Sequence, residues 1–208
     1  MSQAATVTQS FFQNLKVPEG DKTYQKLLDS GLELFTEFGL RRTTMEDVAT
    51  KAGVGRATAY RRFSDKDQLI QVVILRECQR ELSKIEDDLR SIEGGLERVL
   101  ESFVLAVTRA YGHPLLRRLM TSEPETILPM LTQRLWQMMS FFRIYLASLL
   151  DRVKKEGDIR DQSSEMLAEL MLRLVQSMVL SPDGVMNPAD EASVRKVAEL
   201  YLRPLLSR

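Results

Sequence analysis

Residues 43–63 constrain the fold of this chain more than any other stretch, because they hold two short helical patterns separated by a glycine. The apolar residues of the first pattern have the spacing of one helix face: Met45, Val48, Ala49 and Ala52. We expect Thr43 to cap this helix, with Glu46 completing a capping box. Gly53 should end the helix, because glycine readily adopts the positive φ of a helix C-terminus. A second short helix is expected to begin near Gly55.

The second helix is small and basic on its outer face, which carries Arg56, Thr58, Tyr60, Arg61 and Arg62. Two short helices joined by a glycine turn are typical of a helix-turn-helix motif, whose second helix enters the major groove of DNA. The arginine fork matches the two acceptors of guanine, or a phosphate. Residues 39–66 contain seven basic residues against three acidic ones, which fits a DNA-binding surface. The alternative is an ordinary helical hairpin with a solvated charged face.

The stretch from about Lys22 to Leu69 resembles the DNA-binding domain of the TetR family of transcriptional regulators. The matching residues are Leu27, Leu28, Gly31, Leu34, Phe35, Phe38, Gly39, Thr43, Thr44, Glu46, Asp47, Val48, Ala49, Ala52, Gly53, Val54, Thr58, Tyr60, Phe63, Lys66 and Leu69. This sequence departs from the family at Gly55, usually Ser or Thr, at Ala59, usually a larger aliphatic residue, and at Arg62, often His. Glycine is an acceptable N-cap residue, so the predicted fold is unchanged.

We expect ten residues in or beside the motif to contact DNA: Arg42, Thr43, Thr44, Arg56, Ala57, Thr58, Tyr60, Arg61, Arg62 and Lys66. Tyr60 and Lys66 should touch phosphates, whereas Arg56 and Thr58 should contact bases. Arg41 and Arg42 precede the first helix of the motif, where solvated charge and phosphate contact are equally good interpretations.

The rest of the chain has helical periodicity and no β pattern, so we predict an all-α fold of about nine helices. Besides the two of the motif, helices are expected at about 21–38, 65–90, 96–111, 113–121, 129–156, 163–180 and 189–202. Residues 1–20 should form a flexible arm, and residues 21–66 the DNA-binding domain, with the motif at 44–63. The resemblance implies that residues 67–208 form a helical domain for effector binding and dimerisation.

The helix expected at 163–180 is apolar over more than one face, so it needs cover on two sides. In TetR-like proteins the two C-terminal helices form a four-helix dimer interface, and the resemblance implies the same here, with a roughly palindromic operator. The candidate interface residues are Met166, Leu170, Leu174, Met178, Val194, Val197 and Tyr201.

The resemblance also implies a small-molecule pocket whose occupation releases DNA. Methionine and aromatic residues form adaptable apolar walls. The candidate lining is Phe103, Tyr111, Met120, Trp136, Met139, Phe142, Met171 and Val175. Such a lining suits a hydrophobic or amphipathic effector, and the alternative for each residue is core packing.

Composition argues against other classes of protein. The chain of 208 residues has 29 basic and 29 acidic residues, so it is not a wholly basic architectural DNA protein. His113 is the only histidine and Cys78 the only cysteine, so we expect no enzyme, metal site or cofactor. We see no signal peptide or membrane span and expect a cytoplasmic location. A DNA-binding regulator without a small-molecule ligand, controlled by a partner or acting as an activator, remains an alternative, as does a helical adaptor.

Overall fold

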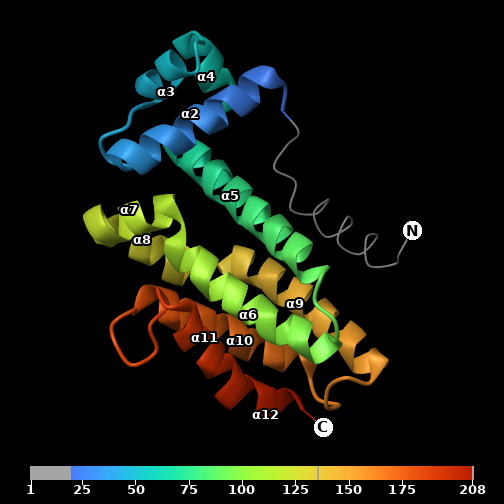
Figure 1. Ribbon diagram of the computed structural model, residues 1–208. Helices are drawn as coiled ribbons and strands as arrows, with labels where there is room; N and C mark the ends of the chain where they lie inside the picture. Colours follow the sequence, from blue (N-terminus) through green and yellow to red (C-terminus); the bar gives the residue numbers. More distant parts are fainter. Residues whose placement is uncertain (1–19, 135, 208) are drawn as a thin grey trace. The chain divides into compact units, whose positions relative to one another are not determined.

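The computed structural model describes residues 20–134 and 136–207, apart from the side chains of residues 133–138. These residues form helices and no strand, which confirms the predicted all-α fold (Figure 1). The predicted N-terminal arm lies outside the described residues except for Gly20. The elements in chain order are α2 Lys22–Phe38, α3 Met45–Lys51, α4 Arg56–Arg62, α5 Lys66–Leu89, α6 Gly95–Gly112, α7 Pro114–Ser122, α8 Pro124–Pro129, the π-helical segment η1 Met130–Arg134, α9 Trp136–Glu156, α10 Ser164–Leu180, α11 Glu191–Val197, the π-helical segment η2 Ala198–Leu202 and α12 Arg203–Leu206.

The chain divides into two compact units. The first unit contains the chain up to Arg80 together with Pro114–Arg134, and the second contains Glu81–His113 and Leu135–Arg208. These units do not follow the predicted division at residue 66, since α5 contributes to both units and α7 and α8 belong to the first. The reason is hydrophobic packing, since α7 and α8 bury their apolar residues in the core that holds the helix-turn-helix motif.

The core of the first unit gathers the apolar faces of α2, α3, α4 and α5. Its most deeply buried side chains are Leu27, Leu28, Phe35, Val48, Ala59, Phe63, Leu69, Val73, Leu119 and Ile127. Burying a ring such as that of Phe63 stabilises the fold by about 1.5–3 kcal/mol. The Tyr24 ring stacks on Phe63 with 4.8 Å between ring centroids, which ties the start of α2 to the end of α4.

Phe38, one of the residues that carry the family resemblance, is 45% exposed at the end of α2. Gly39 ends α2 directly after it with a φ of 85°, and the chain then leaves the helix. The Phe38 ring lines a hollow of about 270 Å³ together with Leu34, Arg42, Thr43 and Asp47.

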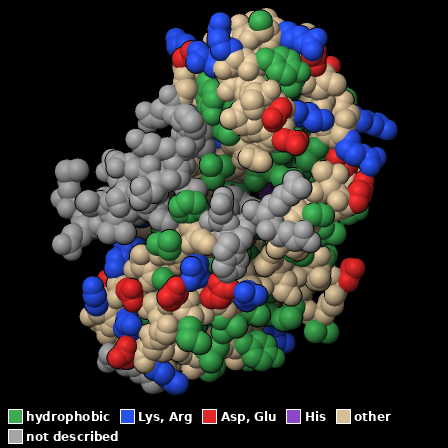
Figure 2. Space-filling model, turned by 180° about the vertical axis from the view of Figure 1, so that it is seen from behind, with side chains coloured by type: hydrophobic (Ala, Val, Ile, Leu, Met, Phe, Trp, Pro, Cys, Tyr) green, Lys and Arg blue, Asp and Glu red, His purple; other side chains and the backbone are tan. Residues whose placement is uncertain are grey.

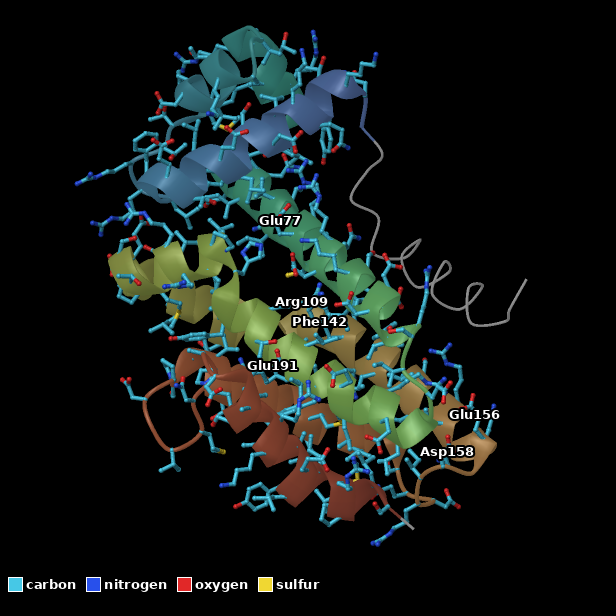
Figure 3. All side chains as sticks on the ribbon, viewed as in Figure 1. Glu77, Arg109, Phe142, Glu156, Asp158 and Glu191 are labelled. Carbon is cyan, nitrogen blue, oxygen red and sulfur yellow. The ribbon has the colours of Figure 1, made fainter. Side chains whose placement is uncertain are left out.

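The second unit packs α6, α9, α10, α11 and α12 around a second core. Its buried side chains include Val99, Phe103, Val107, Leu150, Val153, Met171, Met178, Val194, Val197 and Leu202. The start of α6 is held by the loop after α9, because the Gly95 N–H donates to Asp158 Oδ2 at 2.7 Å. Arg98 and Glu156 form an ion pair of 2.8 Å beside it, and both acidic residues are labelled near this turn in Figure 3.

Two predicted helices have different ends in the structure. The helix expected at 129–156 begins as α9 at Trp136, because α8 already starts at Pro124 and continues through Pro129 into η1. Proline is well placed in a first helical turn, where its missing N–H has no partner to lose. The helix expected at 189–202 begins at Glu191, capped by Asp190, and the helical path continues through η2 and α12 to Leu206.

Candidate nucleic-acid interface

The motif begins one residue later than the sequence suggested. Thr44, rather than Thr43, caps α3, and its partner in the capping box is Asp47 rather than Glu46. The Thr44 N–H donates to Asp47 Oδ2 at 2.8 Å, and the Asp47 N–H donates to Thr44 Oγ1 at 3.1 Å. The Thr44 hydroxyl and N–H hold the pKa of the Asp47 carboxyl below its usual range. Thr44 and Asp47 are both exposed at the N-terminal end of α3.

Thr43 is buried, which corrects its expected contact with DNA. Only 1% of the residue is exposed. Its hydroxyl donates to the carbonyl of Gly39 at 2.8 Å and to that of Leu34 at 3.3 Å. Thr43 therefore fastens the loop between α2 and α3 to the last turn of α2.

The turn between α3 and α4 has the predicted geometry. Gly53 follows α3 with a φ of 68°, and the Val54 N–H donates to the Ala49 carbonyl at 2.9 Å. Gly55 is the N-cap residue of α4, and no side chain completes this cap. The predicted helix start at Gly55 is thereby confirmed to within one residue.

One face of α4 is packed and the other is open. Ala59 is fully buried at the contact with the rest of the first unit, and Phe63 is buried just after the helix. The remaining face carries exposed Arg56, Ala57, Tyr60, Arg61 and Arg62, with Thr58 half-buried. Lys and Arg side chains lie around the upper edge of Figure 2, where Figure 1 shows α3 and α4. The face of α4 expected to meet DNA is therefore available to it.

Several basic side chains near α4 have acidic partners. Arg56 Nε lies 2.7 Å from Glu46 Oε1, and its guanidinium lies 5.4 Å from the centre of the Tyr60 ring. Arg62 pairs with Asp21, which also caps α2. These contacts are exposed, so each contributes little to stability and can be exchanged for a phosphate.

Arg42 and Arg61 differ from these, since neither has an ion-pair or hydrogen-bond partner among the described residues. Both are exposed. Lys66, by contrast, donates from Nζ to the carbonyls of Leu40 at 3.1 Å and Thr43 at 3.2 Å. The Lys66 ammonium thus holds the loop before α3, and its contact with a phosphate stays a prediction.

The residues expected to line an effector pocket are divided between the two units and differ in how deeply they are buried. Phe103 and Met171 lie in the core of the second unit, each with 1% exposed, so packing explains both. Val175 packs against the same core, and Met120 against the core of the first unit. Tyr111, Met139 and Phe142 are half-buried in the second unit. The side chain of Trp136 lies outside the described residues.

Three of the seven expected dimer residues are core residues instead. Met178, Val194 and Val197 are buried within the second unit. Met166, Leu170 and Tyr201 are exposed, with 75%, 43% and 62% of the residue accessible, and Leu174 is half-buried. Two further exposed apolar residues nearby in the chain, Leu200 in η2 and Leu205 in α12, were not among the predicted interface residues. Green side chains gather in the lower part of Figure 2.

No group of three or more His, Cys, Asp or Glu residues in the described part of the chain is placed to hold a metal ion. None of the helices described here is long and apolar enough to cross a membrane.

Comparison with known sequences identifies the motif. Residues 27–73, from α2 into α5, match the family described as bacterial regulatory proteins, tetR family. An uncharacterized HTH-type transcriptional regulator of Mycobacterium tuberculosis (strain H37Rv) is 26% identical over 172 residues, which cover 81% of this chain and 86% of that protein. These relatives are regulators of transcription, not enzymes.

Solved structures share the fold. A TetR-family transcriptional regulator from Pectobacterium atrosepticum superposes with a TM-score of 0.73 at 20% identity, over 90% of this chain and 96% of that one. The regulator AibR, solved in complex with isovaleryl coenzyme A and operator DNA, gives 0.56 at 14% identity, over 86% and 97%. Residues 27–73, which include the basic, exposed face of α4, thus match the tetR family of regulatory proteins, and the chain as a whole is similar to an HTH-type transcriptional regulator and shares the fold of TetR-family structures.

Proposed function

We propose that this regulator is a homodimeric repressor whose two α4 helices occupy successive major grooves of a roughly palindromic operator. The observation that carries the proposal is the division of α4 into a buried side at Ala59 and an exposed side bearing Arg56, Arg61 and Arg62. An α-helix of this kind fits the major groove, and arginine is the side chain best suited to guanine edges and phosphates.

A second copy of the chain is the proposed partner for the exposed apolar residues of the last helices. Met166 and Leu170 lie one turn apart on α10, and Leu200, Tyr201 and Leu205 follow in η2 and α12. Large apolar side chains exposed in this number mark interaction sites more often than free surface. A two-fold dimer also supplies the two DNA-binding helices that a palindrome requires.

A hydrophobic or amphipathic small molecule is the proposed signal for release from DNA. Half-buried Tyr111, Met139 and Phe142 are the remaining candidates for its contacts in the second unit. AibR, which has the same fold, has been solved with both a small molecule and operator DNA. A thermal-shift screen with apolar compounds, repeated in the presence of operator, tests this part separately from DNA binding.

DNA binding itself is tested with the purified full-length chain and fluorescent duplexes from the region upstream of its own gene. We expect saturable binding to one fragment, competed by unlabelled fragment but not by unrelated DNA of equal length. Binding should weaken steeply with salt, because phosphate contacts release counterions. A chain that stays monomeric and binds no duplex at low salt would contradict the proposal.

A further inference from the structure

Glu123 is a buried carboxylate at the junction of α7 and α8, and its residue is only 4% exposed. Its backbone lies at the end of α7 and at the start of α8. The Glu123 N–H donates to the Leu119 carbonyl at 2.9 Å, and its own carbonyl accepts from the Ile127 N–H at 3.1 Å. A carboxylate buried to this degree is costly unless donors lie close to it. The group that donates to the Glu123 carboxylate therefore indicates what this side chain stabilises.

That partner is the loop that precedes the helix-turn-helix motif. Both carboxylate oxygens of Glu123 accept the backbone N–H of Arg41, at 3.1 and 3.2 Å. The carboxylate also occupies the space beside Gly39, where a Cβ atom would lie 2.1 Å from Glu123 Oε1. The loop of residues 39–44 thus comes close to α7 and α8 through one buried acidic side chain, within a single compact unit.

Other hydrogen bonds of this loop come from α5 and from within the loop itself. Lys66 holds the carbonyls of Leu40 and Thr43, and the Thr43 hydroxyl holds that of Gly39. Arg42 remains exposed within the loop, and Thr44 caps α3 at its end. The position of Arg42 and Thr44, both expected to contact DNA, therefore depends on the path of this loop.

We propose that Glu123 is a positioning residue for DNA binding, which fixes the loop of residues 39–44 so that Arg42 and Thr44 meet the phosphate backbone while α4 lies in the groove. The inference rests on the proposed function and on the DNA contacts expected of these two residues from the sequence. Glu125 serves as a contrast: its carboxylate pairs with the Arg41 guanidinium at 2.6 Å, but both side chains are more than half exposed. Such a pair constrains the loop much less than a buried hydrogen bond does.

The charge of Glu123 and its positioning of the loop predict changes of opposite sign in DNA affinity. A carboxylate near the DNA-binding surface repels phosphate, so its charge alone would make any neutral replacement bind DNA more tightly. If position dominates, the loss of the contact weakens binding whether or not the charge is kept. Glu123→Asp keeps the charge but is one methylene too short, and Glu123→Gln loses the charge but keeps an acceptor oxygen.

The experiment measures the affinity of the full-length chain for its operator fragment by fluorescence anisotropy at several salt concentrations. We expect Glu123→Asp to bind roughly fivefold to tenfold more weakly, which is the scale of the net contribution of one hydrogen bond. Glu123→Gln should bind no more tightly than the wild type. The control Glu125→Gln should stay within about twofold of the wild type or bind more tightly, because it frees the Arg41 charge.

A double-mutant cycle separates positioning from a general loss of stability. In an Arg42→Ala background the effect of Glu123→Asp should shrink, because the residue that Glu123 positions is already gone. Hydrogen exchange at the Arg41 amide should be faster in Glu123→Asp than in the wild type. The free energy of global unfolding in urea should fall by less than the free energy of local opening at this amide. An undiminished effect in the Arg42→Ala background would assign Glu123 a structural role only.

Wild-type affinity in Glu123→Asp would overturn the inference, and so would tighter binding by Glu123→Gln. If Glu123→Asp does not fold, the Glu123→Gln result still decides between charge and position. Weaker binding by Arg42→Ala without any effect of Glu123→Asp would defeat this inference and leave the proposed function intact. A wild-type chain that binds no duplex would defeat both.

Discussion

At the scale of single residues, the arginines of α4 differ in what they must give up to bind DNA. Arg56 is held by Glu46 and stacked near Tyr60 in the free protein, whereas Arg61 has no partner among the described side chains. An arginine that must leave a carboxylate gains most where a base edge offers it two acceptors. We therefore assign base contact to Arg56 and phosphate contact to Arg61.

We predict that Arg56→Ala relaxes base preference at one operator position by about 1–3 kcal/mol. Arg61→Ala should instead weaken binding to all sequences and lower the salt slope by about 1. Anisotropy titrations against the operator and its single-base variants, at three salt concentrations, distinguish the two effects. Equal losses on all sequences for both variants would refute the assignment of Arg56 to a base.

Residue-level prediction succeeded where spacing alone decides and failed where two neighbours compete. Gly53 and Gly55 occupy their expected places, because only a glycine readily follows α3 at positive φ. Thr43 and Thr44 both begin a capping pattern, with Glu46 and Asp47 as their respective partners. Spacing could not choose between them, and the burial of Thr43 decided the outcome. Glu123 gave no signal, because an acidic residue before a proline resembles a surface turn.

At the scale of elements, α3 depends on its capping box. We predict that Thr44→Ala destabilises the protein by about 0.5–2 kcal/mol at neutral pH. The matched control is Thr50→Ala, an exposed threonine of the same helix, which should be neutral or slightly stabilising because alanine favours helix. Urea unfolding followed by circular dichroism measures both variants, and an equal loss of stability in the two would contradict the assigned cap.

The capping box also has a pH dependence of definite sign. Thr44 lowers the pKa of the Asp47 carboxyl in the folded protein. The stabilisation by this capping box is therefore fully present above the pKa that Asp47 has in the unfolded chain. It is lost as the pH falls through the lower, folded pKa. The difference in unfolding free energy between the wild type and Thr44→Ala should therefore shrink on acidification, whereas that of Thr50→Ala should stay constant.

The two glycines of the turn provide an opposed pair of substitutions. A Cβ atom at either position meets nothing within 4 Å, so only the backbone distinguishes them. Gly53→Ala should destabilise the protein by roughly 1–2 kcal/mol, because its φ of 68° is strained for alanine. Gly55→Ser should stabilise it by a few tenths of a kcal/mol, since serine can cap α4. Thermal unfolding of both variants checks the prediction, which fails if the two shifts have the same sign.

Prediction of elements was strongest for long helices and weakest for their faces. The uninterrupted pattern at 65–90 gave α5 almost to the residue, because nothing in it breaks a helix. α10 is apolar on more than one side, so its sequence could not say which side is core. Packing assigned Met178 to the interior and left Met166 and Leu170 outside.

At the scale of the whole molecule, the two units are joined by three chain connections. One lies within α5, after Arg80, and the others precede Pro114 and follow Arg134. The segment of α7 and α8 therefore belongs to the first unit, but both of its ends are attached to the second unit. Glu123 lies near the centre of this segment, where its carboxylate accepts the Arg41 N–H of the loop before α3.

The exposed apolar residues of α10 and η2 lead to the last prediction. Placing a charge among them should separate the proposed dimer, because a buried unpaired carboxylate is strongly disfavoured. We expect Leu170→Asp to be a folded monomer in sedimentation equilibrium, with normal circular dichroism and a large loss of operator affinity. Tight operator binding needs both half-sites, since each chain supplies one recognition helix and linked binding multiplies affinity.

The control lies on the same helix. Met178→Asp places the same charge in the core of the second unit and should prevent folding altogether. A dimeric Leu170→Asp variant with full operator affinity would show that the exposed residues of α10 have another purpose. A monomeric variant that still bound the operator as tightly as the wild type would mean that one α4 helix is sufficient, and that the operator need not be a palindrome.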